Sequence, residues 1–184
     1  MAKAYPVIDD RMAQFIRQQK MFFVATAPLR GEGHINLSPK GLDTLVLLDS
    51  TTVAYLVLTG SGIETIAHLR ENRRIVIMLC AFEGPPKIVR LHGRGAVIER
   101  GSSAFAMLLA RFPPHKGVRS IIRVKLERIS DSCGYGVLLY QYAGERKQLI
   151  EWVRHKGPDG IREYQQKNNA VSIDGLAGLS VQGN

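Results

Sequence analysis

The stretch Phe22-Phe23-Val24-Ala25-Thr26-Ala27, followed after a short turn by His34-Ile35-Asn36-Leu37-Ser38-Pro39-Lys40-Gly41, decides the fold predicted for this chain. The first run is β-branched and aromatic, which is typical of a strand, and the proline and glycines after it predict a turn between two antiparallel strands. The second run ends in polar, turn-forming and cationic residues. Asn36, Ser38 and Lys40 are therefore expected at the end of a rigid sheet, where an anion can be held.

Short strands continue outward from this pair along most of the chain. The turns between the first four strands are too short for crossover helices, so successive strands must pair antiparallel. Seven or eight antiparallel strands with helices at their margins are better closed into a barrel than left with exposed edges, so the predicted fold class is mainly β. The strands are predicted at 21–27, 34–38, 45–49, 52–59, 75–82, 87–99, 120–129 and about 135–142. Helices are predicted from an Asp9 or Asp10 cap to Lys20, and at 63–71, 102–112, 145–156 and 158–167.

A second loop, Thr59-Gly60-Ser61-Gly62, follows a strand and opens a helix. Free backbone N–H groups and the helix dipole favour a phosphate at such a place. Ser61 and Glu64 also have the Ser-x-x-Glu spacing of a capping box, which explains both residues without any ligand. The functional interpretation adds a phosphate held by Thr59, Ser61, Thr65 and the amides around Gly62. Two anion-friendly loops on one sheet suggest a nucleotide-like cofactor.

The length of 184 residues most simply makes one domain, residues 1–184, which can bury roughly 70 per cent of its unfolded surface. Its C-terminal part, about 144–184, is predicted to form helices and then a tail. That tail carries four large apolar residues: Val171, Ile173, Leu176 and Leu179. Such a tail should dock either on this chain or on a partner.

Composition limits the compartment and the partners. The two cysteines lie in unrelated settings, so a protein with reduced cysteines is predicted. No apolar run has the length of a signal-peptide core or a membrane span, so a cytoplasmic protein without a membrane partner is predicted. A net charge of +9 would suit a polyanion, but lysine and arginine are scattered with no basic block, so no nucleic-acid partner is predicted. The five histidines have no close metal spacing and no Cys-x-x-Cys occurs, so no metal site is predicted.

Several motifs together resemble the pyridoxamine-phosphate-oxidase-like flavoproteins, over most of the chain. The motifs are Phe22–Ala27, Gly33–Gly41, Thr59–Thr65 and Arg90–Gly95, and the segments Asp131–Val137 and Ser172–Leu176 resemble one uncharacterised bacterial subgroup. The resemblance implies a split β-barrel that binds FMN across a homodimer interface. True pyridoxamine-phosphate oxidases also carry an arginine and a lysine on the second barrel strand, and an arginine-rich C-terminus. Here those places hold Asn36 to Lys40 and Gly175 to Leu179, so the vitamin-phosphate substrate is not implied.

With this resemblance, the cofactor-binding residues are predicted to be Asn36, Leu37, Ser38, Lys40, Thr59, Ser61, Gly62, Thr65 and Arg90. Lys40 is the first candidate for the phosphate, because a compact ammonium on a strand-end loop suits a dianion; the alternative is a solvated turn lysine. Asn36, Leu37 and Ser38 would lie along the flavin ring or its ribityl chain, or else serve the turn before Pro39. Arg90 would reach the cofactor, or else pair with Glu83 or Glu99.

The function predicted from these observations is that of an FMN-dependent oxidoreductase acting on a small organic substrate. No catalytic residue is singled out, because the sequence offers no evident general acid or base. That absence keeps open a non-catalytic protein that binds flavin or a tetrapyrrole as a store or sensor. No Rossmann glycine fingerprint is present, so a nicotinamide donor would have to visit the flavin transiently.

Overall fold

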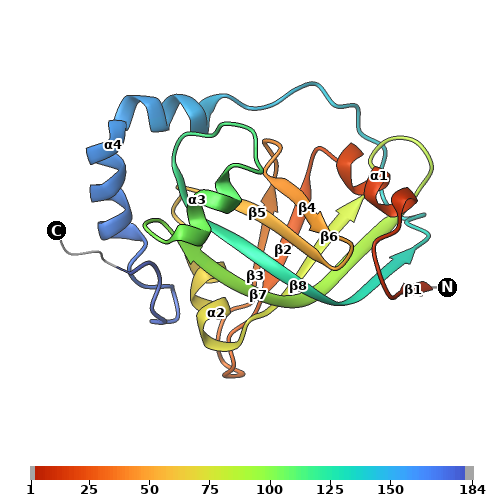
Figure 1. The fold of residues 1–184 in the computed structure, drawn as a ribbon, viewed down its shortest axis with the longest axis horizontal. Coiled ribbons are helices and arrows are strands. Elements are labelled where there is room, and N and C mark those ends of the chain that lie inside the picture. Colours follow the sequence, from red (N-terminus) through yellow and green to blue (C-terminus); the bar gives the residue numbers. More distant parts are fainter. Residues whose placement is uncertain (1–2, 181–184) are drawn as a thin grey trace.

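One continuous antiparallel sheet, curled on itself, forms the centre of the molecule (Figure 1). The structure is a computed structural model and describes residues 3–180. In it the strands follow the order β3-β2-β6-β7-β8-β5-β4, and β1 pairs with the far half of β8. Their bounds are β1 Lys3–Tyr5, β2 Phe22–Thr26, β3 Asn36–Lys40, β4 Leu45–Asp49, β5 Thr52–Leu58, β6 Arg74–Cys80, β7 Ile88–Glu99 and β8 Val118–Ser132. The predicted fold class, a mainly β antiparallel split barrel with marginal helices, is confirmed.

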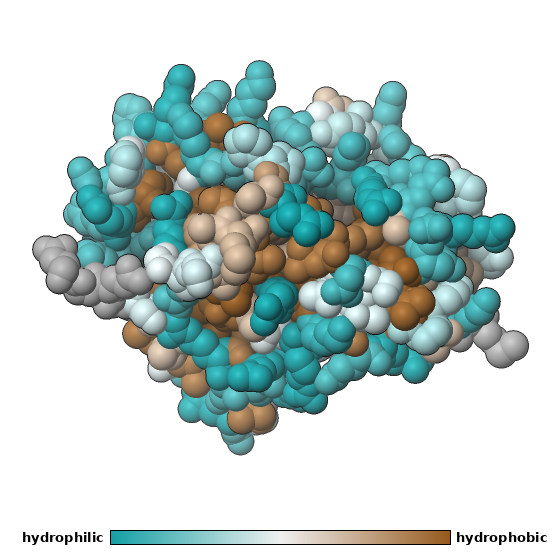
Figure 2. All heavy atoms as spheres, viewed as in Figure 1, coloured by the Kyte–Doolittle hydropathy of each residue, from teal (hydrophilic) through white to brown (hydrophobic). Residues whose placement is uncertain are grey.

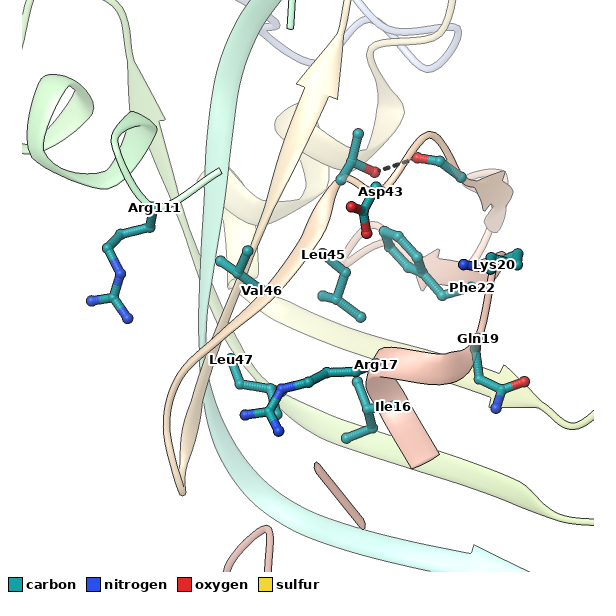
Figure 3. A pocket seen from close by; sticks show the side chains of 12 residues that line it. Ile16, Arg17, Gln19, Lys20, Phe22, Asp43, Leu45, Val46, Leu47 and Arg111 are labelled. Carbon is teal, nitrogen blue, oxygen red and sulfur yellow. Dashed lines mark hydrogen bonds between the residues drawn. The ribbon is translucent and has the colours of Figure 1, made fainter. Parts of the chain in front are cut away.

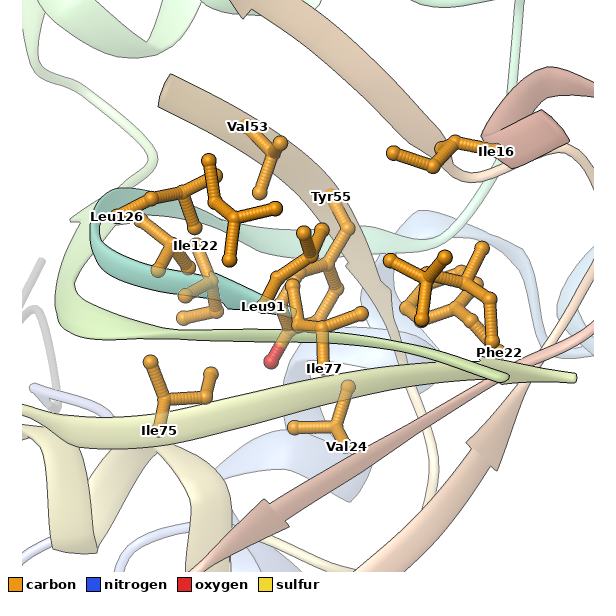
Figure 4. Packing of buried hydrophobic residues seen from close by; sticks show 14 of the residues in the cluster. Ile16, Phe22, Val24, Val53, Tyr55, Ile75, Ile77, Leu91, Ile122 and Leu126 are labelled. Carbon is orange, nitrogen blue, oxygen red and sulfur yellow. The ribbon is translucent and has the colours of Figure 1, made fainter. Parts of the chain in front are cut away.

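The barrel interior is filled by side chains that alternate along the strands. On β8, Ile122, Val124 and Leu126 are buried while Arg123 and Lys125 between them are exposed, as the alternation in the sequence predicts. Figure 4 shows Val24, Ile77, Leu91 and Ile122 from four different strands converging on the ring of Tyr55. This shared core holds β2 and β5 at fixed positions. The candidate functional site described below lies at the ends of β5 and of β3, the partner of β2.

Four helices lie at the margins of the sheet (Figure 1): α1 Asp10–Gln18, α2 Glu64–Asn72, α3 Ser103–Leu109 and α4 Gln148–Asn168. Asp9 caps α1, since its carboxylate accepts a hydrogen bond of 2.8 Å from the amide of Met12, so the predicted cap is confirmed. Helix α2 contacts β2, β6 and β7. Among the described helices, none is both long enough and apolar enough to span a bilayer.

The predicted strand at about 135–142 is wrong. Residues 133–147 instead form an extended segment without strand pairing, here named the strap, which crosses from the end of β8 to α4 (Figure 1). Gly134, with φ of 68°, turns the chain away, and any Cβ at this position would lie 2.8 Å from the amide nitrogen of Lys87. In addition, β1 already pairs with the edge of β8 at Ile129 to Asp131.

The two helices predicted at 145–156 and 158–167 correspond to the two parts of α4, which Gly157 separates with a non-helical φ of 66° and ψ of 176°. The described part of the C-terminal tail docks on its own chain. Asp174 accepts hydrogen bonds from the amide of His34 and from its Nδ1, at 2.8 and 2.6 Å. Leu179 packs against the barrel core. The tail therefore rests beside the start of β3.

Gly93 marks a close approach of β7 to β8. The pairing register shifts between His92 and Gly93, and a Cβ on Gly93 would lie 2.2 Å from the carbonyl oxygen of Lys125. Because backbone cannot yield as a side chain does, Gly93→Ala is expected to cost about 2–3 kcal/mol and lower the melting temperature by about 5–10 °C. Differential scanning calorimetry measures this. Gly136→Ala, which has open space around it, is the control, and equal melting temperatures for both variants would contradict the prediction.

Candidate functional site

A pocket opens at the seam of the barrel, between the ends of β3 and β5 and the loop that leads into α2. Strands β3 and β4 are the two edge strands of the hydrogen-bonded sheet, so no backbone pairing closes the barrel between them. The pocket, here named the seam pocket, has a volume of about 290 Å³. Leu149 of α4 contributes to its lining, so the C-terminal helix covers part of it. The seam is thus enclosed by segments that are far apart in the sequence.

Six of the predicted cofactor-binding residues line the seam pocket: Asn36, Ser38, Lys40, Thr59, Gly62 and Thr65. The other three do not line it. Leu37 alternates to the outside and is 65 % exposed. Ser61 presents its carbonyl to Asn169. Arg90 lies on β7 and donates to Ser132 Oγ at 3.1 Å. Its two alternative partners are engaged elsewhere, since Glu99 pairs with Arg70 and Glu83 accepts from the amide of Tyr142.

Lys40 is a half-buried cation in this pocket. No hydrogen bond or ion pair joins its ammonium to any other residue in the range 3–180. Burial and, to a smaller extent, the charge of Arg119 lower the pKa of Lys40 to about 8, although the carboxylate of Glu64 opposes both effects. A lysine held in this state is poorly solvated and forms no direct ion pair with a described residue, and at such a place an added anion is strongly attracted.

Arg119, at the start of β8, is the pocket residue that the sequence reasoning missed. Its side chain is 6 % exposed, and burial lowers its pKa to about 10. Its guanidinium donates to the carbonyl of Gly60 at 3.0 Å, to the carbonyl of Gly62, and to Asn169 Oδ1 at 2.8 Å. Its Nε is buried without a hydrogen-bond partner in the described chain. The available signal was an arginine inside the otherwise apolar run around Ile121 and Ile122.

The loop 59–62 is held from the side of α4 as well. Gln165 donates to Thr59 Oγ1 at 2.7 Å, and Asn169, fully buried at the end of α4, donates to the carbonyls of Gly60 and Ser61. These bonds engage carbonyls of the loop, and the amide of Thr59 donates to the carbonyl of Gly117 at 2.8 Å. The capping-box alternative is wrong, since Ile63 is the N-cap of α2 and no side chain caps that end.

A chain of polar side chains fixes β3 against α2. Ser38 Oγ donates to Asn36 Oδ1 at 2.9 Å, and Asn36 Nδ2 donates to Thr65 Oγ1 at 2.9 Å and to Thr26 Oγ1 at 3.3 Å. Thr26 in turn contacts His68 Nδ1 at 3.0 Å, and burial lowers the pKa of that imidazole, which keeps it neutral. The side chains of Asn36 and Ser38 are therefore occupied in positioning the strand that carries Lys40.

A larger cleft of about 820 Å³ adjoins the seam pocket and is here named the strap cleft, because the strap forms one of its walls. Pro39, Lys40 and Gly41 line both cavities. Tyr142 is fixed there, with its amide donating to Glu83 Oε1 at 2.8 Å and its hydroxyl to Glu145 Oε1 at 3.0 Å. A ligand anchored at Lys40 can thus extend into a cleft with aromatic walls.

A third cavity lies beside the turn 41–44 (Figure 3). Its cations can be compared with those of the seam pocket to decide which cavity is the stronger candidate for an anion site. Its volume is about 270 Å³. Gly41 and Thr44 line both this cavity and the seam pocket, and Thr44 donates a hydrogen bond to the Gly41 carbonyl, dashed in Figure 3. Its three cations, Arg17, Lys20 and Arg111, are exposed side chains. The seam pocket is the stronger candidate because its cations are desolvated.

Comparison with known proteins agrees with this architecture. A family model described as pyridoxamine 5'-phosphate oxidase matches residues 8–133, more than half of the chain. The chain is 36 % identical over 194 residues to the pyridoxamine 5'-phosphate oxidase family protein ustO of Aspergillus flavus, covering 95 % of this chain and 77 % of that protein.

Two solved structures share the fold. A candidate pyridoxamine 5'-phosphate oxidase from Lactobacillus delbrueckii superposes with a TM-score of 0.55 at 15 % identity, covering 69 % of this chain and 98 % of that one. HupZ of Group A Streptococcus superposes with a TM-score of 0.51 at 23 % identity, covering 66 % of this chain and 91 % of that one. The solved structures share the fold, and the family model and the sequence relative show that the chain belongs to the pyridoxamine 5'-phosphate oxidase family.

Proposed function

We propose that this protein binds FMN, with the phosphate held in the seam pocket by Lys40 and Arg119. The observation that carries the proposal is the half-buried, unpaired ammonium of Lys40 beside the buried guanidinium of Arg119. Glu64 also lines the pocket and opposes an anion, but it faces two cations. The hydroxyls of Thr59 and Thr65 add polar groups to the same wall.

The strap cleft suits the rest of the cofactor and a substrate. FMN, when bound, supplies hydride and single-electron transfer, and the protein supplies binding, orientation and exclusion of water. Pro39 and Gly41 join the phosphate site to the cleft, and Tyr140 and Tyr142 offer aromatic surface along it. We therefore propose an FMN-dependent oxidoreductase whose small organic substrate enters beside the strap.

A second candidate is a protein that binds flavin or a tetrapyrrole without turnover. It is favoured by the lining of the seam pocket, which contains neither histidine nor cysteine within the described range and has Glu64 as its carboxylate. Incubation of the FMN-loaded protein with NADH under anaerobic conditions separates the two candidates. Bleaching of the flavin and reoxidation by an added acceptor would support the enzyme, and an unreduced flavin would favour the binding protein.

We further propose that the protein acts as a homodimer. Apolar surface gathers over α3, β4 and β5 in the view of Figure 2, framed by polar residues. The partly buried members of this face are Val46, Leu48, Leu58, Ile98, Leu108 and Leu109, and Met107 beside them is 69 % exposed. An apolar patch of this kind on a small protein marks an interaction site. Sedimentation equilibrium of the wild type and of a Met107→Lys variant tests the dimer.

The first experiment is a visible absorption spectrum after FMN is added and unbound flavin is removed by desalting. A retained flavin at about one per chain supports the proposal. An absence of retained flavin, together with no quenching of FMN fluorescence on titration, would overturn it.

The affinity for FMN is expected to fall above pH 8. Burial holds the pKa of Lys40 at about 8 in the ligand-free site, and a bound phosphate dianion raises that pKa. Binding then takes up a proton at higher pH, so the affinity is full between about pH 6 and 8 and falls by up to about tenfold for each pH unit above. Fluorescence titrations from pH 6 to 9.5 measure this. A Lys40→Arg variant should give a flat profile, and a flat wild-type profile would contradict the assignment.

A further inference from the structure

A separate cavity lies between α4 and the loop that joins α3 to β8, here named the α4 cavity. Its volume is about 480 Å³, within the usual range for pockets that hold small organic ligands. It shares no lining residue with the seam pocket. It is lined by Arg100, His115, Lys116, Gly117, Val153, Arg154, Gly157, Pro158, Ile161, Arg162 and Gln165.

The side chains around the α4 cavity are strongly basic. Its lining contains three arginines, one lysine and one histidine, and no aspartate or glutamate. Arg162 pairs with Asp159, but both side chains are largely exposed, so solvent screens this pair. Arg154 and Lys116 have no hydrogen bond or ion pair within residues 3–180. The Nε2 atom of His115 is buried there and also lacks a hydrogen-bond partner.

The floor of the same cavity is apolar and its shape is fixed by backbone geometry. Val153 and Ile161 are buried on either side of the break in α4 at Gly157. Gly117 has φ of 74°, and a Cβ there would lie 2.7 Å from Val153 Cγ2, so the helix rests directly on the loop backbone. Pro158 then restarts the helix beside the cavity. The cavity thus combines exposed cations with the buried apolar side chains of Val153 and Ile161.

We propose that the α4 cavity binds an organic anion with an apolar body, about the size of a nucleoside monophosphate. Guanidinium groups recognise phosphate and carboxylate oxygens through paired hydrogen bonds and also stack on flat rings. The floor formed by Val153 and Ile161 accepts the apolar part of the ligand. A nucleotide and a medium-chain carboxylate share this chemistry. The site is separate from the proposed FMN site.

Isothermal titration calorimetry tests the proposal with three probes: adenosine 5'-monophosphate, octanoate and inorganic phosphate. The titrations use the full chain with FMN present at saturation, so that the seam pocket is filled. At least one organic probe is expected to bind about tenfold or more tightly than inorganic phosphate, because inorganic phosphate cannot use the apolar floor. Tighter binding of adenosine 5'-monophosphate would indicate a ligand with an aromatic body, and tighter binding of octanoate a ligand with an aliphatic one.

The double variant Lys116→Gln/Arg154→Gln is expected to weaken binding of that probe by about tenfold or more. Its matched control is Arg123→Gln/Arg146→Gln, which removes two exposed cations outside the cavity and should leave the affinity within about twofold. All four side chains are exposed, so both proteins should fold.

Three results would overturn the proposal: organic probes that bind no better than inorganic phosphate, an affinity unchanged in the double variant, or competition between the probe and FMN. The outcome of these titrations does not depend on whether the protein binds FMN. If the protein fails to bind FMN, the same titrations without flavin, on the wild type and on Lys40→Met, still decide whether the α4 cavity is a site.

Discussion

Replacement of Lys40 by methionine is expected to raise the melting temperature of the ligand-free protein while weakening its affinity for FMN about a hundredfold. The half-buried ammonium is poorly solvated and has Arg119 nearby, so burial lowers its pKa from the ordinary 10.5 to about 8. Removing this charge is expected to stabilise the folded state by about 1–2 kcal/mol. The same change deletes the charge that we propose for the phosphate, which accounts for the loss of affinity.

The pH dependence of this stabilisation has a definite sign. In the range from about pH 8 to 10.5, the unfolded wild type holds more protons on residue 40 than the folded wild type, so wild-type stability rises with pH. The advantage of Lys40→Met should therefore be largest below pH 8 and shrink as the pH approaches 10. Thermal melts across this range and FMN titrations at pH 7 measure the two effects.

Lys20→Met is the matched control, because Lys20 lines the neighbouring strap cleft and lies 5.7 Å from the ring of Tyr142. It should change the affinity for FMN far less than Lys40→Met. A Lys40→Met protein that retains full FMN affinity would show that the phosphate lies elsewhere. A lowered melting temperature would show that Lys40 is a structural residue.

Arg119→Met is expected to lower the melting temperature by about 5–15 °C and to abolish retention of FMN. The buried guanidinium satisfies the carbonyls of Gly60 and Gly62 and the side chain of Asn169. Methionine fills a similar volume but leaves these acceptors partly unsatisfied, at a cost of about 2–4 kcal/mol in the free energy of unfolding. The loop 59–62 would also lose one of the groups that fix it at the seam.

Two further variants separate position from charge. Arg123→Met, at an exposed site on the same strand, should leave the melting temperature and the retention of FMN near those of the wild type. Arg119→Lys retains the positive charge but cannot reach three acceptors in the geometry of a guanidinium, so only part of the stability should return. An unchanged melting temperature in Arg119→Met would contradict the role given to this residue.

The alternation of side chains made much of the barrel predictable. Strand Phe22–Thr26 and the stretch Ile122–Leu126 of β8 bury every second residue, which is the period of two that a strand with one buried face requires. The prediction failed at 135–142, where Leu138 and Leu139 are exposed and no strand forms. The hydrophobicity of a segment does not show whether a sheet edge is available for it to pair with. Here β1 pairs with part of the edge of β8.

The sequence by itself determined the antiparallel barrel, the Asp9 cap and the strand end that carries Lys40, because each depends on local periodicity or on neighbouring residues. Only the tertiary structure revealed Arg119 in the seam pocket, the hold of Asn169 on the loop 59–62, and the basic α4 cavity. These features join residues about 50 to 110 positions apart. Their physical basis is burial and charge proximity, which arise only when the barrel closes and α4 folds back across its seam.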